Sequence, residues 1–213
     1  MELPLFPLHL VLFPGRPLPL HLFEPRYRQM LGDCLDADRR FGVVAIREGF
    51  EVGTTPEIYE VGTIAEIESV TELDNGRFDI LTRGVQRFRV CEQVGGSAYA
   101  KARVEPLPDG PATDFDQPNA KALRALLVPY LAGLGAPEEL LEHLPHGPDQ
   151  LAYLAAAAVQ GELREQQELL ELESTSLRLR ATLDVLRRET SIMRRFGTVA
   201  SLRPLDPRGA DLN

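Results

Sequence analysis

Short apolar runs separated by turn residues fill the first half of the chain. Within them, large apolar side chains recur at about every second position, which is the pattern of a half-buried β-strand. The strands expected cover residues 3–10, 18–23, 41–46, 64–70, 77–82, 85–94 and 99–107. Asp74-Asn75-Gly76 predicts a hairpin, because Asn-Gly accepts the two positive φ angles of a type I′ turn. The pattern also indicates a bulge at Glu68-Ser69.

One helix interrupts the strands. Residues 24–35 repeat apolar side chains at i, i+3, i+4 and i+7, which is the spacing of one helix face. That face consists of Tyr27, Met30, Leu31 and Cys34. Pro25 suits the first turn of this helix, where its missing N–H is harmless.

The second half of the chain is helical in pattern. Residues 106–118 are rich in proline and aspartate, which is typical of a linker, and the apolar period then changes to about 3.6. The helices expected cover residues 119–133, 137–144, 149–160, 163–172 and 175–196, and the C-terminal caps expected are Gly161 and Gly197. In the last helix a narrow apolar seam, which we expect to pack within its own bundle, consists of Leu179, Leu183, Leu186 and Met193.

These elements predict an α+β fold with two parts. We expect a small closed or half-closed barrel in residues 1–107, a helical bundle in residues 118–197 and a loose tail in residues 198–213. A length of 213 residues allows one large domain or two small ones. Hydrophobic residues make up 44% and charged residues 26%, which excludes disordered, collagenous and disulfide-scaffold classes.

Charge and hydropathy limit the classes of binding partner and the cellular location that we expect. The net charge of −9 argues against nucleic-acid binding, because phosphate recognition needs a basic surface. The first 23 residues are apolar, but they contain Glu2, no lysine and no arginine, so we reject a signal peptide. The longest uncharged run, residues 3–15, is shorter than the roughly 20 residues that a membrane helix needs. We therefore expect a cytoplasmic protein that has no membrane partner.

Motifs of known chemistry are absent from the sequence. It contains no phosphate loop, no GxGxxG, no HExxH and no GxSxG. Cys34 and Cys91 form no CxxC pair, and the four histidines have no spacing that favours a metal. We therefore predict no catalytic residue, no metal site and no cofactor.

Two short stretches combine aromatic and charged residues, at 23–28 and at 84–89. One interpretation is structural: Arg26 or Arg87 pairs with Glu24 and fixes the first helix to the barrel. The other is functional: these groups form the rim of a peptide-binding groove.

Several motifs together resemble the N-terminal, substrate-binding domain of the Lon protease family. They are LPLFPL at 3–8, VLFPG at 11–15, PLHLFEPRY at 19–27, VGTIA at 61–65, DNGR at 74–77 and GVQRF at 84–88. The resemblance covers roughly residues 1–200 and implies a PUA-like pseudo-β-barrel followed by a helical bundle. In the full protease this region contacts substrate, and ATPase and peptidase modules follow. We expect a stand-alone bacterial member of the family without those modules, so that any peptidase label would be inherited from the larger enzyme.

The resemblance implies a non-catalytic module that binds polypeptides, with a role as an adaptor in protein quality control. The partners expected are unfolded or hydrophobic polypeptide segments, together with a protease or a chaperone. A client would add to an edge strand or lie in the cleft between the two halves. The candidate binding residues are Phe13, Pro14, Phe23, Tyr27 and Phe50, and the candidate structural or groove-rim charges are Glu24, Arg26 and Arg87.

Alternatives stay open at this point. Phe13, Pro14 and Phe50 belong either to an exposed apolar patch or to the core. The alternative functions are an activity hidden in the cleft and weak nucleic-acid binding by the PUA-like barrel.

Overall fold

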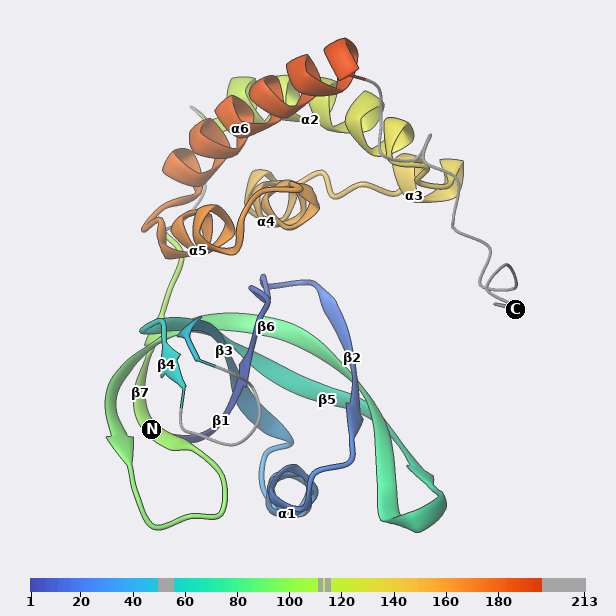
Figure 1. The fold of residues 1–213 in the computed structure, drawn as a ribbon. Coiled ribbons are helices and arrows are strands. Elements are labelled where there is room, and N and C mark those ends of the chain that lie inside the picture. The colour runs from blue at the N-terminus through green and yellow to red at the C-terminus, as the bar shows by residue number, and fades with distance from the viewer. Residues whose placement is uncertain (50–55, 111–112, 114–115, 197–213) are drawn as a thin grey trace, which may run out of the picture.

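The computed structural model describes residues 1–49, 56–110, 113 and 116–196. A strand layer and a helical layer lie one above the other (Figure 1). The strands are β1 (Glu2–Leu8), β2 (Pro17–Leu22), β3 (Arg40–Glu48), β4 (Glu57–Ile58), β5 (Val61–Leu73), β6 (Arg77–Val94) and β7 (Lys101–Leu107). One helix, α1 (Pro25–Leu35), lies on the side of the strands that faces away from the helical layer (Figure 1).

Five strands close into a barrel. Antiparallel pairing links β1, β7, β6, β5 and β3 in that order, and a parallel pairing of β1 with β3 closes the ring. The two remaining strands pair with members of this ring: β2 pairs with β6, and β4 pairs with β3. The predicted α+β class is confirmed.

Phe88 fills the centre of the barrel and is fully buried. Its ring lies against the backbone of two neighbouring strands at Gly42 and Gly62. A Cβ atom at these positions would approach Phe88 Cζ to 2.5 and 2.8 Å, respectively. Both positions therefore need glycine for close approach.

The predicted hairpin is present between β5 and β6. Asn75 and Gly76 both have positive φ, at 65° and 66°, within the short turn Asp74–Gly76. The pairing of β5 with β6 shifts register between Ile67 and Ser69, where the bulge was expected. The two strands expected at 77–82 and 85–94 are one strand, β6, which continues through Gly84 with a register shift at Val85.

Gly84, within β6, exchanges backbone hydrogen bonds with the loop before β2. Gly84 N–H donates to Arg16 O over 2.9 Å, and Gly15 N–H donates to Gly84 O over 2.7 Å. A Cβ at position 84 would lie 2.5 Å from Phe13 O, so this close approach also requires glycine.

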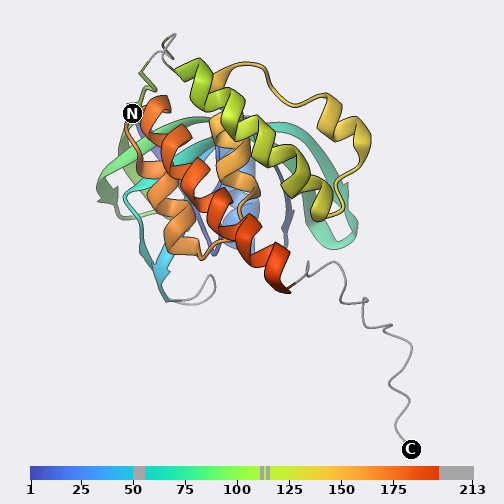
Figure 2. The same ribbon diagram turned by 90° about the horizontal axis from the view of Figure 1, so that it is seen from above.

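The helical layer contains α2 (Gln117–Gly133), α3 (Glu138–Glu142), α4 (Pro148–Ala158), α5 (Leu163–Glu171) and α6 (Thr175–Phe196). Seen from above, α2 and α6 run side by side in the same direction (Figure 2). The predicted seam on α6 packs inside this layer, because its members Leu179, Leu183 and Leu186 are buried in the helical core and Met193 packs against it. No helix among the described residues is long and apolar enough to span a bilayer.

The expected cap at Gly161 is wrong. Helix α4 ends at Ala158, and Val159 is already extended with ψ 135°. Gly161 does not have the positive φ of a C-terminal cap. Gly197 and the predicted tail lie outside the described residues.

The two layers share core side chains. Phe13, from the loop before β2, is 1% exposed and belongs to the apolar core of the helical layer, together with Val61 of β5. Gln167 of α5 donates from Nε2 to Val61 O over 2.9 Å. Of the two alternatives left open for Phe13, the core is the one found and the exposed patch is not, because its ring fills the junction between the layers.

Candidate functional site

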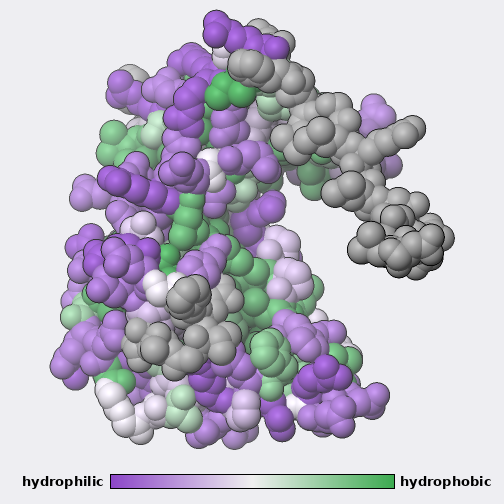
Figure 3. Space-filling view, in the orientation of Figure 1, coloured by the Kyte–Doolittle hydropathy of each residue, from purple (hydrophilic) through white to green (hydrophobic). Residues whose placement is uncertain are grey.

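A groove opens in the barrel where β1, β2 and the start of α1 meet. The part between the two strands has a volume of ≈ 130 Å³ and is lined by Phe6, Pro7, Leu8, Leu20, His21, Phe23, Glu24 and Tyr27. A neighbouring part of ≈ 280 Å³ extends from Tyr27 to Ile58 of β4 and to the 93–101 segment between β6 and β7. Pro7 and Tyr27 line both parts, so we treat them as one feature, the barrel groove. Figure 3 shows apolar surface over this side of the barrel, below a more polar helical layer.

The groove exists because β1, after Pro4, and β2 each leave one edge without a strand partner in the described sheet. β7 pairs with β1 only at Glu2–Pro4, and Leu5 N–H then donates to Ala100 O over 2.8 Å. In the described sheet β2 pairs with β6 but not with β1. Prolines at positions 4, 7, 17 and 19 remove backbone donors from β1 and β2, and proline is found mainly on edge strands for this reason.

Aromatic rings form the floor and one end of the groove. The Phe6 and Tyr27 rings stack with centroids 4.1 Å apart, and the Arg26 guanidinium lies 4.5 Å from the centroid of Tyr27. Phe23 is 57% exposed, and its ring lies 6.1 Å from that of His21 in a stacked arrangement. Tyr27 is thus part of a fixed wall, whereas Phe23 offers an apolar face to solvent.

Two side-chain pairs lie near the groove, and one further cation, Lys101, lines its larger part. Arg26 Nε donates to Glu24 Oε2 over 2.9 Å, so one of the two expected pairings is confirmed. Both residues lie at the start of α1, and their contact therefore closes the first turn rather than linking the helix to the barrel. His21 Nδ1 lies 2.6 Å from Asp79 Oδ1, and both side chains are about half exposed. The groove lining thus combines apolar side chains with a few polar and charged groups.

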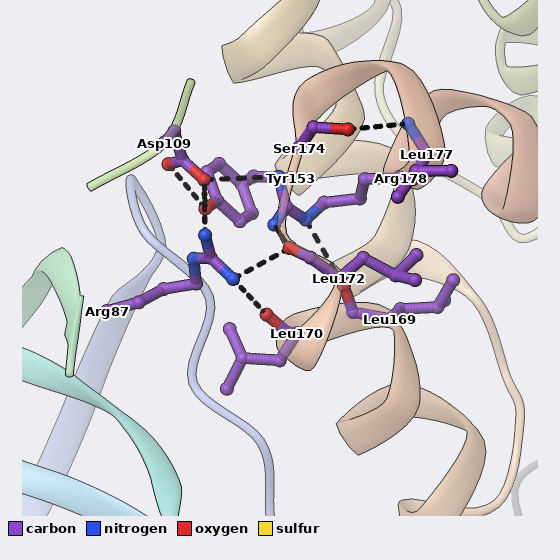
Figure 4. A network of polar contacts seen from close by, with 9 residues as sticks. All are labelled: Arg87, Asp109, Tyr153, Leu169, Leu170, Leu172, Ser174, Leu177 and Arg178. Carbon is purple, nitrogen blue, oxygen red and sulfur yellow. Dashed lines mark hydrogen bonds and ion pairs between the residues drawn. The ribbon is translucent and has the colours of Figure 1, made fainter. Parts of the chain in front are cut away.

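Arg87 lies elsewhere, at the junction of the two layers (Figure 4). It does not pair with Glu24, so that expectation is wrong. Its Nη1 donates to the carbonyls of Leu170 and Leu172 over 2.8 Å, and its Nη2 donates to Asp109 Oδ1 over 2.7 Å. Arg87 starts on β6 and ends beside the end of α5, because its side chain crosses the layer boundary.

Asp109 joins three elements at this junction, namely β6 through Arg87, α4 through Tyr153 and α6 through Arg178. It accepts hydrogen bonds from the Tyr153 hydroxyl, over 2.6 Å to Oδ1, and lies 3.4 Å from Arg178 Nη1. The Arg178 guanidinium also lies 4.2 Å from the centroid of Tyr153. Burial lowers the pKa of Arg178 and raises that of Tyr153. We call Arg87, Asp109, Tyr153 and Arg178 the junction network, and its groups serve to hold the layers together.

Two further candidate residues do not join the groove. Pro14 is half-buried in the loop beside Phe13 and does not line the barrel groove. Phe50 lies outside the described residues. The structure therefore brings together Phe23, Tyr27, Glu24 and Arg26 among the residues singled out from the sequence.

The titratable groups in and beneath the groove include a thiol and a phenol. Within the described part of the chain, no cluster of three or more histidine, cysteine or acidic side chains could hold a metal ion. Burial, with smaller contributions from Asp38 and Asp33, raises the pKa of the Cys34 thiol to about 12, so this thiol is protonated at neutral pH. Tyr99 donates to Asp33 Oδ2 over 2.6 Å, and burial raises its pKa. The tyrosine is therefore a fixed hydrogen-bond donor at the groove wall.

Sequence reasoning missed several lining residues, including Pro7, Leu20 and Ile58. Apolar periodicity identifies them as strand residues, but it does not reveal that β1 and β2 leave a gap. The prolines at alternate positions of β2 were the available signal, since they mark an edge strand.

Comparisons with known proteins agree with the geometry. A family model described as the ATP-dependent protease La (LON) substrate-binding domain matches residues 2–188. The Lon protease of Anaeromyxobacter dehalogenans is 31% identical over 202 residues, and Lon protease 2 of Myxococcus xanthus is 30% identical over 200 residues. Each match covers 90% of this chain but 24% of the relative, so the chain spans about a quarter of their length.

Solved structures give the same picture. A Lon N-terminal domain protein from Xanthomonas campestris has a TM-score of 0.63 and 26% identity, covering 86% of this chain and 98% of its own. The N-terminal domain of Lon protease from the Mycobacterium avium complex has a TM-score of 0.70 and 20% identity, covering 88% and 98%, and this likeness concerns the fold alone.

Proposed function

The chain belongs to the ATP-dependent protease La (LON) substrate-binding domain family, and from this we propose that it is a non-catalytic module that binds unfolded or hydrophobic polypeptide segments in the barrel groove. The proposal assigns the apolar interior of the groove to client side chains. It assigns the Glu24–Arg26 pair to the rim.

The exposed ring of Phe23 is the observation that carries this proposal. Among the described side chains it is the one aromatic group that is mostly exposed. It stands beside a groove whose other lining residues are mostly apolar or aromatic side chains of β1, β2 and α1, together with His21 and Glu24. An apolar surface of this kind marks an interaction site, because burying it against a partner is favourable.

Side-chain burial, rather than strand addition, should supply most of the binding energy. Proline lacks an N–H, so Pro7, Pro17 and Pro19 cannot donate to the backbone of a client lying between β1 and β2. Such binding tolerates many client sequences, since apolar burial is not directional.

The wider role is that of an adaptor in protein quality control, with a protease or a chaperone acting on the bound client. A cytoplasmic location remains a prediction from the sequence. The named relatives are Lon proteases, of which this chain matches about a quarter.

Binding of a fluorescein-labelled apolar peptide, followed by anisotropy, tests the proposal. Replacing Phe23 by serine should weaken binding about tenfold, since burying the rest of such a ring contributes roughly 1–1.5 kcal/mol. The Leu177→Ser variant is the matched control, because Leu177 is 47% exposed but lies on α6. It should bind as the unchanged chain does.

Capture of unfolded clients provides a second test. The purified chain should retain a denatured client better than an acidic protein of similar charge does. Equal capture by both proteins, or equal weakening by F23S and L177S, would contradict the assignment of the groove.

A further inference from the structure

Another hollow lies in the helical layer, with a volume of ≈ 570 Å³. We call it the helical pocket. Its apolar lining includes Leu134 after α2 and Ile192 and Met193 near the end of α6. Ile192 is 50% exposed, so a large aliphatic group faces solvent at its edge. This volume lies within the range of sites that bind a ligand or an anchoring side chain.

Two helix ends lie beside the pocket, those of α2 at Gly133 and α4 at Ala158. A helix C-terminus carries a partial negative charge, so both ends contribute a negative potential. That contribution is small, because carbonyls of the last turn of α2 accept from the N–H groups of Leu134, Gly135 and Ala136, and Ala158 O accepts from the Tyr130 hydroxyl. Helix α5 begins at the same place, but Glu165 in its first turn offsets its positive end.

Carboxylates add to this negative field. Glu162, Glu165 and Glu189 line the pocket, and among the described lining residues the one cation, Arg188, pairs with Glu165 over 2.7 Å. Glu189 accepts hydrogen bonds from the Tyr130 hydroxyl and, over 3.2 Å, from Gln160 N–H. Burial and the neighbouring Glu189 raise the pKa of Tyr130, so its hydroxyl remains a donor that fixes the Glu189 carboxylate.

We propose that the helical pocket binds a polypeptide segment in which a lysine or arginine adjoins a large apolar side chain. The negative field selects the cation, and the wall of Leu134, Ile192 and Met193 takes the apolar neighbour. The inference rests on the proposed function only in that the ligand is a polypeptide. It adds a site that prefers a cation, whereas the barrel groove carries the cation Lys101 in its own lining.

Methionine methyl NMR reports on the two sites separately. The chain has three methionines, of which Met193 lines the helical pocket and Met30 packs with Phe6 and Tyr27 under the barrel groove. A short peptide with alternating leucine and arginine should shift the Met193 signal. The same peptide with glutamate in place of arginine, or serine in place of leucine, should leave that signal unmoved.

Two variants test the contributions of the wall and the charge. Ile192→Ser and Glu162→Gln should each weaken binding of the leucine–arginine peptide by about fivefold, the upper range for one exposed contact. Both residues lie at the surface, so circular dichroism should show an unchanged fold. Leu177→Ser, at an exposed site in the first turns of the same helix, should bind normally.

The outcomes separate the pocket from the groove. A Met193 signal that stays unmoved, or that shifts equally with the glutamate peptide, overturns the inference, and a shift of Met30 alone supports the barrel groove only. A Met193 shift caused by raising the protein concentration alone assigns the pocket to a second copy of the chain and overturns the inference too. A Met193 shift that the F23S variant retains upholds the pocket even if the groove fails.

Discussion

Removing the Asp109 carboxylate should loosen the contact between the barrel and the helical layer. Arg87 is 2% exposed and Arg178 is fully buried, and both point a guanidinium at Asp109. In the Asp109→Ala variant these two cations would face each other at the junction without a counter-charge. The Tyr153 hydroxyl would lose its acceptor as well.

The magnitude follows from the burial of the partners. Breaking a buried ion pair by removing one member costs about 3–5 kcal/mol, because the other charge stays desolvated. Asp109 is itself partly exposed, and the backbone carbonyls of Leu170 and Leu172 still accept from Arg87. We therefore expect a loss of about 3 kcal/mol in the free energy of unfolding. For a chain of this length that corresponds to a fall in Tm of about 10 °C.

Urea unfolding followed by circular dichroism measures the effect. The matched control is Asp184→Ala, which removes an exposed pair with Arg187 and should cost at most about 0.5 kcal/mol. Hydrogen exchange should also rise at α5 and β6, whose contact the network fixes. A D109A variant within about 0.5 kcal/mol of the unchanged chain would refute the reasoning that the network holds the layers together.

Three further results are expected. Gly62→Ala should lower the free energy of unfolding in urea by about 1–3 kcal/mol, because its Cβ would lie 2.4 Å from Val43 O. The control Gly32→Ala, on α1, should be neutral or stabilising, because a Cβ there would have no atom within 4 Å. The buried Cys34 thiol has a pKa of about 12 when folded but about 8.5 when unfolded, so the free energy of unfolding should fall as pH rises from about 8.5 towards 12. At about pH 8 a thiol reagent should modify the exposed Cys91 before the buried Cys34. Equal rates of modification would contradict the burial of Cys34. Purified chain should leave casein intact with or without ATP, and acid-soluble peptides in this assay would contradict the non-catalytic proposal.

Local signals in the sequence predicted most of the elements. The Asn75-Gly76 hairpin and the buried face of α1 could be predicted, because turn preferences and helical periodicity depend on residues only a few positions apart. The break expected at Gly84 failed because a loop on the neighbouring strand, rather than local chemistry, determines the role of that glycine.

Contacts between residues far apart in the sequence could not be predicted from local patterns. The partners of Arg87 at Leu170 and Leu172 lie more than 80 residues away, and no spacing rule connects them. Phe13 was open to two interpretations, since apolar residues occur both in cores and in binding patches. The Glu24–Arg26 pair could be predicted because its members lie two residues apart in the sequence.

The parallel contact between β1 and β3, together with the pairing of Leu3 with Ala102, has a consequence for biosynthesis. The ring cannot close before residue 107 has left the ribosome, roughly 5–20 s after the first strand at ordinary translation speed. During that interval the nascent apolar strands lack their final neighbours, and these sequence-distant pairings should make maturation slow. Newly made copies should therefore depend on holding chaperones more than a helical protein of the same size does.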